Sequence, residues 1–231
     1  MDLDRALQTT GAVREFSSHP VPDEVVRHIL DTARYAPSGG NRQAWRVILV
    51  KDPEIRRRLR DLYLHGWYEY VAMGAAGLVP WAPVTNRDAE REALQQVERL
   101  ATESAQGPGG FAEHFDQVPV LLVLLADLRS LAAVDRDLDR YTLVGGASIY
   151  PFAWSILLAA HGAGLGGVMT TMLVREEDQA RDLLGVPSEW AVAGALALGY
   201  PAAGKRPTRL RRAPVERFTN IDRFDGPALA R

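Results

Sequence analysis

The stretch from Tyr141 to Val174, YTLVGGASIYPFAWSILLAAHGAGLGGVMTTMLV, contains no Asp, Glu, Lys or Arg. A run this long without charge belongs at the centre of a fold, because charged side chains are rarely buried unless they are paired. Pro151, His161 and six glycines divide the run, so its helical piece is shorter than the roughly 20 apolar residues that a membrane helix needs. The sequence therefore predicts a buried core unit.

Within this stretch the pattern predicts a helix, a glycine turn and a strand. The helix is expected over Ile149–Ala160, with Pro151 in its first turn, where the missing N–H is tolerated. Its apolar residues occur on every side, which is typical of a helix buried in a large core or at a subunit interface. Glycines between 162 and 167 lead into the strand Val168–Thr171. They match G-x-G-x-x-G, but a dinucleotide fingerprint follows a strand and opens a helix, so tight backbone packing is the favoured explanation.

The composition fits one large domain or two small ones, with 231 residues and 47% hydrophobic content. The net charge of −2 gives no general attraction for nucleic acid or membranes, although residues 205–212 are locally basic, as a nucleic-acid site would require. The chain has no cysteine, which excludes disulfides and thiol redox cycling, so any redox chemistry needs a bound cofactor. The N-terminal residues form no apolar signal region, and we expect a cytoplasmic protein without a membrane partner.

Around the central unit, strands and helices alternate irregularly, which favours an α+β sheet covered by helices. Helices are expected over 2–9, 22–36, from Asp52 to a tip within Tyr63–Tyr70, and over Arg87–Ala105, Arg129–Tyr141 and Arg175–Leu184. Further strands are expected over Arg46–Val50, Val118–Ala126 and Trp190–Leu198. We expect 1–231 to be a single domain, with 63–117 as a helical cover and 199–231, rich in proline, as an extended strap.

Polar residues accompany the most apolar elements. They are Arg14, the loop Pro37–Trp45 (PSGGNRQAW), Thr170–Thr171 and the arginines 209, 211 and 212. Each has an ordinary explanation as a solvated arginine, a turn or capping residue, or a strand threonine. Their conjunction favours a ligand site. Other signatures are absent: the chain has no P-loop, H-E-x-x-H or EF-hand motif, and Tyr150 stands where a nucleophile elbow needs glycine.

Three blocks of this sequence resemble, in order, the FMN-dependent nitroreductase family. They are Ala12–Phe16 (AVREF), Pro37–Trp45, and the buried helix with Gly164-Leu165-Gly166 and Thr170–Thr171; the ending Gly199-Tyr200-Pro201 and 211–216 (RRAPVE) also agrees. The resemblance implies a nitroreductase-like α+β fold, with a central mixed sheet flanked by helices, in an interlocked homodimer that holds two FMN sites at its interface. It further implies an oxidoreductase that uses NAD(P)H to reduce a small electron-poor acceptor, nitroaromatic- or quinone-like, by a ping-pong mechanism.

The resemblance also assigns roles to residues. Arg14 is expected beside the pyrimidine side of the flavin, Ser38, Gly39, Asn41 and Gln43 at its polar and ribityl edges, Met169, Thr170 and Thr171 by the ring, and Arg212 with Arg211 at the phosphate. Trp67, Tyr68 and Tyr70 are candidates to stack on the acceptor, although packing alone would explain them. These roles agree with physical chemistry, because an arginine favours a reduced, negatively charged flavin and its planar fork suits phosphate. No side chain is expected to be catalytic, since the flavin carries the chemistry.

Two positions depart from the family pattern. Thr10 and Gly11 stand where members usually carry one or two basic residues that help to bind phosphate, and Ala44 replaces the usual proline before Trp45. The first departure removes at least one positive charge that would help to bind the phosphate. Two alternatives therefore stay open beside the oxidoreductase: a flavin enzyme that does not use nicotinamide, such as a dehalogenase or a flavin ring-cleaving enzyme, and a non-catalytic flavin carrier or binding protein.

Overall fold

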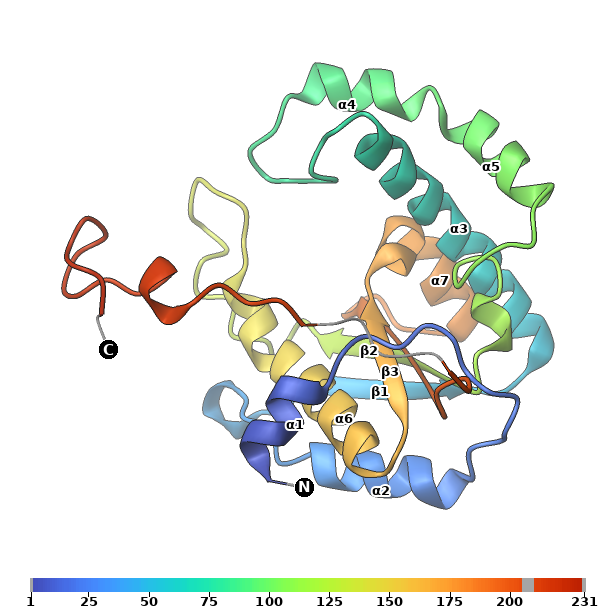
Figure 1. Cartoon of the computed structure of the whole chain (residues 1–231), viewed down its shortest axis with the longest axis horizontal. Helices are drawn as coiled ribbons and strands as arrows, with labels where there is room; N and C mark the ends of the chain where they lie inside the picture. Colours follow the sequence, from blue (N-terminus) through green and yellow to red (C-terminus); the bar gives the residue numbers. More distant parts are fainter. Residues whose placement is uncertain (1, 205–209, 230–231) are drawn as a thin grey trace.

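The protein, described here by a computed structural model for residues 2–204 and 210–229, is built around one four-stranded sheet (Figure 1). The strands are β1 (Trp45–Val50), β2 (Val120–Asp127), β3 (Gly166–Thr170) and β4 (Trp190–Gly199), in the spatial order β1-β2-β4-β3. All three neighbouring pairs are antiparallel. Among the described residues, parallel pairing is limited to one isolated bridge between Ala12 and Gly167, so the expected mixed sheet is antiparallel apart from that bridge.

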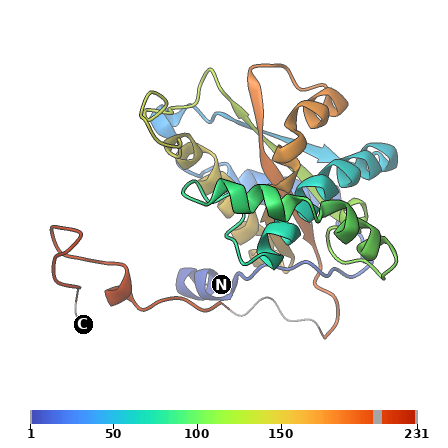
Figure 2. The same cartoon turned by 90° about the horizontal axis from the view of Figure 1, so that it is seen from above.

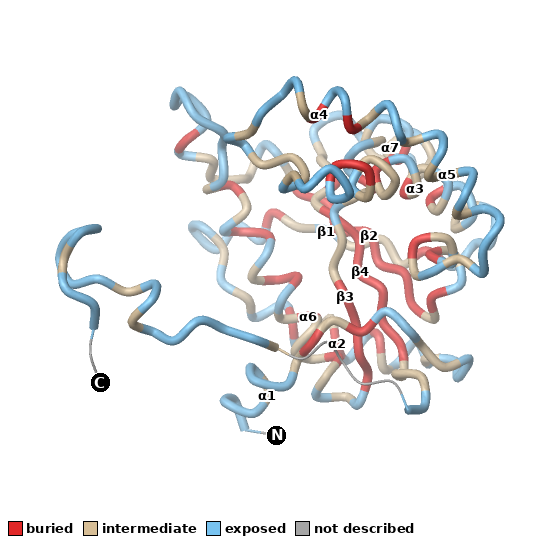
Figure 3. The backbone as a smooth tube through the Cα atoms, turned by 45° about the horizontal axis from the view of Figure 1, so that its top comes forward, coloured by how far each residue is buried: buried red, intermediate tan, exposed pale blue. Residues whose placement is uncertain are grey.

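Helices cover both faces of the sheet, because β2 and β4 are apolar on both sides. Leu122 and Leu124 of β2 pack with α2 (Asp23–Ala33) and α6 (Tyr150–Gly162), whereas Leu121 and Val123 face the opposite side and pack with α3 (Pro53–Ala75) and α7 (Glu177–Leu184). This alternation follows the two-residue period of a strand. Figure 3 shows the buried residues concentrated along the strands and the helix faces that meet them.

The structure contains the expected central unit of helix, turn and strand. The helix α6 begins at Tyr150, the turn uses Gly164 at φ +80°, and β3 follows. A Cβ atom on Gly166 would lie 2.5 Å from Val13 Cγ2, and one on Gly167 would lie 2.9 Å from the Ala197 carbonyl oxygen. Close backbone packing therefore explains the two glycines, as the sequence indicated.

The outer face of α6 is open in the single chain. Tyr150 is 43% exposed and Trp154 is 39% exposed, whereas Phe152, Ala153 and Ile156 are buried. The helix is therefore not enclosed on all sides by its own chain, unlike a helix buried within one core.

Three helix predictions were wrong. The aromatic run Tyr63–Tyr70 is not a fraying tip: it lies inside α3, where Gly66 allows a close approach, since a Cβ there would lie 2.7 Å from the Met172 carbonyl oxygen of η4 (Met172–Glu176). The helix expected over 87–105 is two helices, α4 (Arg87–Leu94) and α5 (Val97–Ala105), which both pack along α3.

The third wrong prediction is the helix over 129–141, where the chain forms consecutive turns. The carboxylate of Asp135, 2% exposed, accepts hydrogen bonds from the backbone N–H of Leu143 (2.8 Å) and from Arg140 Nη1 (2.8 Å). Aspartate that bonds nearby backbone groups competes with helical hydrogen bonding, which explains the turns.

The remaining elements are α1 (Leu3–Thr9), η1 (Gly39–Asn41), η2 (Phe115–Gln117), η3 (Val144–Ser148) and η5 (Val215–Arg217). Residues 210–214 are extended, as expected of a strap, and the short η5 follows. Residues 219–229 then fold back on themselves, with an antiparallel bridge between Asn220 and Ala228. The whole segment projects away from the body of the protein (Figures 1 and 2). Phe218 is 67% exposed there and Phe224 is 100% exposed. The basic residues Lys205, Arg206 and Arg209 lie outside the described residues. Among the described helices, none has the length and apolarity to cross a bilayer.

Candidate functional site

A cavity of about 390 Å³ brings together three residues that the sequence singled out, Arg14, Met169 and Arg212. They reach it from different elements: Arg14 from the segment after α1, Met169 from β3, and Arg212 from the strap. The bridge between Ala12 and Gly167 fixes the first segment against β3. Thr10, Gly11, Ala12, Trp154, Leu157, Gly167, Val168 and Leu210 complete the lining. Distant parts of the chain therefore build one site.

The charged side chains of this cavity are two arginines whose positive charges are not neutralised by nearby carboxylates of the described residues. Arg14 and Arg212 are exposed, and within the described residues neither forms an ion pair with a carboxylate. Arg212 Nη1 donates to the Arg211 carbonyl oxygen (3.0 Å), while Arg211 itself does not line the cavity. Two such cations beside an apolar wall of α6 and β3 suit an anionic ligand with a flat apolar part.

The loop with Ser38, Gly39, Asn41 and Gln43 lies elsewhere. Its shape is held by the Ser38 hydroxyl, which accepts from Gln43 N–H (3.0 Å), and by Gly39 N–H, which donates to the buried Ser148 hydroxyl (3.0 Å). Asn41 and Gln43 both have positive φ, at 53° and 50°. Such angles are uncommon for residues other than glycine and cluster at functional sites. None of the four residues lines either cavity that contains Arg14.

A second cavity of about 880 Å³ also contains Arg14, on the side of the cover. Trp67, Phe111, His114 and Gln117 are among its lining residues. Of the three candidate stacking residues, Trp67 therefore shares a cavity with Arg14. Tyr70 stacks on Trp67 at 5.6 Å between ring centroids, and the Tyr68 hydroxyl donates to Glu113 Oε1 (3.2 Å), so these two support the wall from outside it.

Glu113 ties the cover to this second cavity. Its carboxylate accepts from the Ser104 hydroxyl at the end of α5 (2.6 Å), from Gly110 N–H (2.7 Å) and from Tyr68 on α3. Burial acts to raise the pKa of Glu113, but these hydrogen bonds from Ser104 and Gly110 outweigh it and hold the pKa below its ordinary value. An ionised Glu113 thus joins α3, α5 and the glycine loop.

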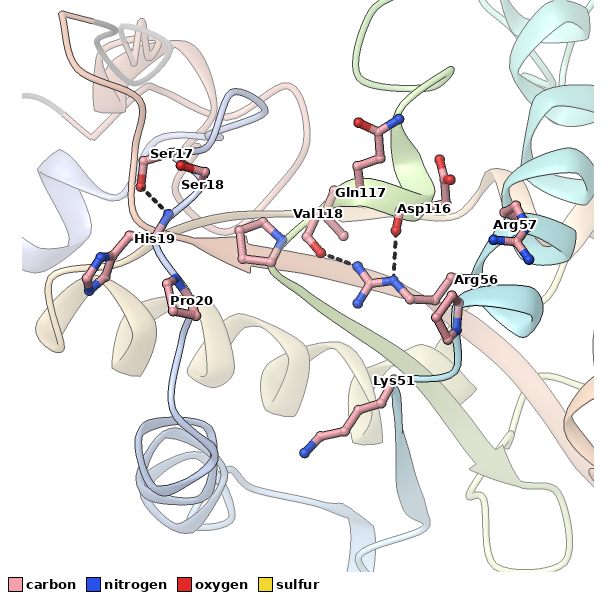
Figure 4. A pocket seen from close by; sticks show the side chains of 12 residues that line it. Ser17, Ser18, His19, Pro20, Lys51, Arg56, Arg57, Asp116, Gln117 and Val118 are labelled. Carbon is pink, nitrogen blue, oxygen red and sulfur yellow. Dashed lines mark hydrogen bonds between the residues drawn. The ribbon is translucent and has the colours of Figure 1, made fainter.

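A third cavity, of about 420 Å³, adjoins the second through Ser17, Ser18 and residues 117–119 (Figure 4). Arg56 lines this cavity, and its guanidinium donates hydrogen bonds to the carbonyl oxygens of Asp116 (2.8 Å) and Val118. Burial lowers the pKa of Arg56. This arginine is thereby engaged in holding the chain before β2, and none of the residues singled out by the sequence lies in this cavity.

The end of β3 is attached to α3 by a buried side chain. The Tyr63 hydroxyl lies 3.0 Å from Thr170 Oγ1, and the Tyr63 ring, 2% exposed, stacks on Phe115 at 4.3 Å between centroids. Burial raises the pKa of Tyr63, while the charge of Arg14 acts in the opposite direction. Thr171 is exposed and precedes η4.

Sequence reasoning missed Trp154 and Phe111, which line the two cavities that contain Arg14. Phe111 resembles an ordinary core aromatic residue in sequence, so no local signal distinguished it. Trp154 lies on α6, which the sequence predicts to be buried on every side. Its 39% exposure and its place in the cavity lining are seen only in the structure.

Comparison with known proteins identifies the family. The model of the nitroreductase family matches residues 9–200. The chain belongs to the nitroreductase family. Members of this family are FMN-dependent oxidoreductases, so the protein is a nitroreductase-family flavin oxidoreductase.

Individual nitroreductase relatives differ in their reactions. The chain is 31% identical over 219 residues to a NADH dehydrogenase from Thermus thermophilus, covering 94% of each chain. It is 28% identical over 213 residues to iodotyrosine deiodinase 1 from Rattus norvegicus, covering 92% of this chain and 66% of that protein. A crystal structure of iodotyrosine deiodinase bound to FMN and 3-iodo-L-tyrosine has the same fold, with a TM-score of 0.64, 22% identity, and coverage of 95% of this chain and 100% of that one.

Proposed function

We propose that the cavity between Arg14 and Arg212 binds FMN and that the protein uses NAD(P)H to reduce a small electron-poor organic acceptor, nitroaromatic- or quinone-like, in two alternating half-reactions. The observation that carries this function is the meeting of Arg14, Met169 and Arg212 in one cavity, with both arginines free of carboxylate partners among the described residues. Relatives named as a NADH dehydrogenase and as FMN-bound enzymes support the choice of cofactor and reductant.

The residues of the cavity fit FMN. A flavin mononucleotide combines a flat, largely apolar ring with a phosphate, and the cavity combines an apolar wall from Leu157, Trp154 and β3 with two arginines. Arg212 would hold the phosphate through its planar guanidinium, and Thr10 and Gly11 beside it supply no charge. Arg14 would place positive charge near the ring and so favour its reduced form.

When bound, FMN supplies the hydride and electron transfer, and the chain supplies position and electrostatics. Met169 and the end of β3 would set the depth of the ring, with Thr170 and Thr171 at its edge. Trp67 and Phe111 line the second cavity next to Arg14, which has space for the reductant and then the acceptor in turn. No described side chain is assigned as a proton donor to the acceptor.

The proposed active form is a homodimer, and residues 1–231 are taken as one domain. The 38–43 loop lies outside both cavities that contain Arg14, so in one chain Ser38, Gly39, Asn41 and Gln43 do not meet Arg212. A second copy that packs on the open face of α6 would bring its own loop to this cavity. Trp154 and the exposed aromatic residues of the strap, Phe218 and Phe224, support this arrangement, because such apolar surface is normally covered.

Reductive dehalogenation is the second candidate, supported by the 28% identity to iodotyrosine deiodinase 1 over 92% of the chain. It would use the same cofactor site but would not require nicotinamide. A non-catalytic flavin carrier remains the third, suggested by the missing charge at Thr10 and Gly11.

Two measurements test the proposed function. The purified protein, or protein incubated with excess FMN and then desalted, is expected to show flavin absorbance bands. Anaerobic stopped-flow mixing with NADPH or NADH is then expected to bleach these bands, and a nitroaromatic or quinone to restore them. A protein that stays colourless after incubation with FMN would contradict the proposed FMN site. A yellow protein that neither nucleotide bleaches would contradict the use of NAD(P)H as reductant. Turnover of 3-iodotyrosine with dithionite as the reductant, in place of the nucleotide, would then favour dehalogenation.

A further inference from the structure

A smaller cavity, of about 190 Å³, adjoins the cavity that Arg14 and Arg212 line. The two cavities have four lining residues in common: Thr10, Gly11, Leu157 and Gly167. His161, in the last turn of α6, lines only the smaller one. Among the described residues, His161 is the only ionisable side chain in that lining, and no carboxylate lines either cavity. An anion bound where the two cavities meet would therefore lie between an imidazole and two arginines.

The hydrogen bond between His161 and Thr9 decides which ring nitrogen carries a proton. His161 Nε2 lies 2.9 Å from Thr9 Oγ1, where α1 lies beside α6 (Figure 1). The Thr9 hydroxyl donates its one proton to the Arg5 carbonyl oxygen (2.6 Å). Thr9 Oγ1 can then only accept, so His161 Nε2 donates to it. Any further hydrogen bond that His161 donates comes from Nδ1, which carries a proton only when the ring is charged.

The surroundings of His161 favour a cation at this place when a phosphate is near. The C-terminal end of a helix carries partial negative charge, which attracts a cation and repels an anion, so a phosphate at this end of α6 needs positive charge beside it. A bound phosphate in turn stabilises the protonated form of an adjacent imidazole. Without an anion, the positive charges of Arg14 and Arg212 act against a third positive charge.

The elements packed against α6 place no buried charge near His161. Neither β3 nor β4 contains a charged residue. The charged or titratable side chains of the two packed helices are all exposed: Asp2 at the start of α1, Asp4 and Arg5 on α1, and Asp23, Glu24, Arg27, His28 and Asp31 on α2. Solvent screens these exposed charges, so the lining of the two cavities decides the local field.

We propose that His161 is a phosphate-binding residue of the FMN site: its protonated ring supplies, from the smaller cavity, a second positive charge for the phosphate that Arg212 holds. This role rests on the proposed FMN site. Thr10 and Gly11, which border both cavities, carry no charge, so without His161 a phosphate dianion would be paired with one guanidinium. Because Nδ1 must gain a proton before it can donate, binding of FMN takes up a proton, and binding of riboflavin, which lacks the phosphate, does not.

The first test measures the affinities of FMN and riboflavin by quenching of flavin fluorescence in the wild type and three variants. His161→Gln keeps an N–H donor for Thr9 but cannot be charged, whereas His161→Lys keeps a positive charge. His28→Gln is the matched control, because His28 is exposed on α2 and lines neither cavity.

His161→Gln is expected to weaken FMN binding by about five- to 20-fold, the loss of one partly exposed charge-assisted hydrogen bond, and riboflavin binding by less than about two-fold. His161→Lys and His28→Gln are expected to stay within about three-fold of the wild type for both ligands. Equal losses for FMN and riboflavin in His161→Gln would show that His161 only holds α1 against α6. A lysine variant as weak as the glutamine variant would show that its charge plays no part.

Proton uptake gives a second readout that a purely structural role would not change. Calorimetric titration near pH 7 in two buffers of different ionisation enthalpy measures the protons taken up on binding. The wild type is expected to take up a fraction of a proton more with FMN than His161→Gln does, since this difference cancels the phosphate's own proton exchange.

The wild type alone keeps the proposal testable if His161→Gln does not fold. Equal proton uptake with FMN and with riboflavin would contradict the role of His161. Wild-type protein that binds neither flavin would instead overturn the proposed FMN site itself, so the two failures are distinguishable.

Discussion

Arg211 and Arg212 are neighbours in sequence but have different surroundings. Arg212 lines the cavity with Arg14, whereas Arg211 is exposed outside it and contributes its carbonyl oxygen to Arg212 Nη1. A phosphate bound in this cavity would therefore meet one guanidinium of the pair. The sequence could not separate the two, because adjacent residues of an extended segment point in opposite directions and their order alone does not say which one faces the body.

Arg212→Ala is expected to weaken FMN binding by about 10- to 100-fold, since it removes charge-assisted hydrogen bonds to phosphate. Arg211→Ala removes the same charge from the same segment and is expected to change the affinity by less than about three-fold, because it leaves only long-range attraction weakened by salt. Titration of FMN by fluorescence quenching at two salt concentrations measures both. Equal losses in the two variants would contradict a specific contact with Arg212.

At the scale of elements, the turns over 129–141 depend on one carboxylate. Hydrogen bonding from Leu143 N–H is the largest cause that holds the pKa of Asp135 below its ordinary value; burial opposes it, and Arg140 adds to it. A group with a lowered folded pKa stabilises the fold above its unfolded pKa, about 3.9, and this contribution is lost as the pH falls through the folded value.

Asp135→Asn is therefore expected to lower the melting temperature at pH 7, and the gap between variant and wild type is expected to close as the pH falls from 5 toward 3. Thermal unfolding followed by circular dichroism across this range measures the gap. Asp139→Asn is the control, because Asp139 is exposed in the same segment and makes no hydrogen bond among the described residues. A gap that stays constant with pH would show that Asp135 does not act through its charge.

At the scale of the whole molecule, the residues proposed for the FMN site lie in two separate places in one chain. Arg212 and Arg14 line a cavity, and the 38–43 loop lies against Ser148, at the start of α6. The strap projects from the body with Phe224 fully exposed, and the outer face of α6 leaves Trp154 open. Under the proposed homodimer, the 38–43 loop of a second copy would complete the cavity that Arg14 and Arg212 line.

Complementation between two defective chains tests this arrangement. Arg212→Ala and Asn41→Ala are each expected to impair FMN binding, but when the two are co-expressed, a mixed dimer unites the intact Arg212 of one chain with the intact loop of the other. With random pairing, about a quarter of all sites are then whole, because half the dimers are mixed and each has one repaired site. The flavin content of the co-expressed, purified protein measures the fraction of sites that bind FMN. No recovery above the separate variants would place loop and arginine in the same chain, or one of them outside the site.

The sequence by itself determined the central unit and most of the sheet. A charge-free run, a proline in the first turn and a row of glycines specify a buried helix, a tight turn and a strand, because these depend on local backbone preferences and on the cost of burying charge. The same reasoning located the apolar strands β2 and β4. It was wrong over 129–141, where the bonds of the Asp135 carboxylate replaced helical bonds, and over 63–70, where packing against η4 prolonged the helix.

The tertiary structure alone decided which polar residues share a cavity. Arg14, Met169 and Arg212 line one cavity because the chain after α1 is bridged to β3 and part of the strap lies beside it. The 38–43 loop is instead held by the hydrogen bond from Gly39 N–H to the Ser148 hydroxyl. It also attached Tyr63 to Thr170, two residues that share no local pattern. Periodicity reports whether a residue is buried, but its neighbours are fixed by how all the layers pack at once, and no stretch of sequence contains that information locally.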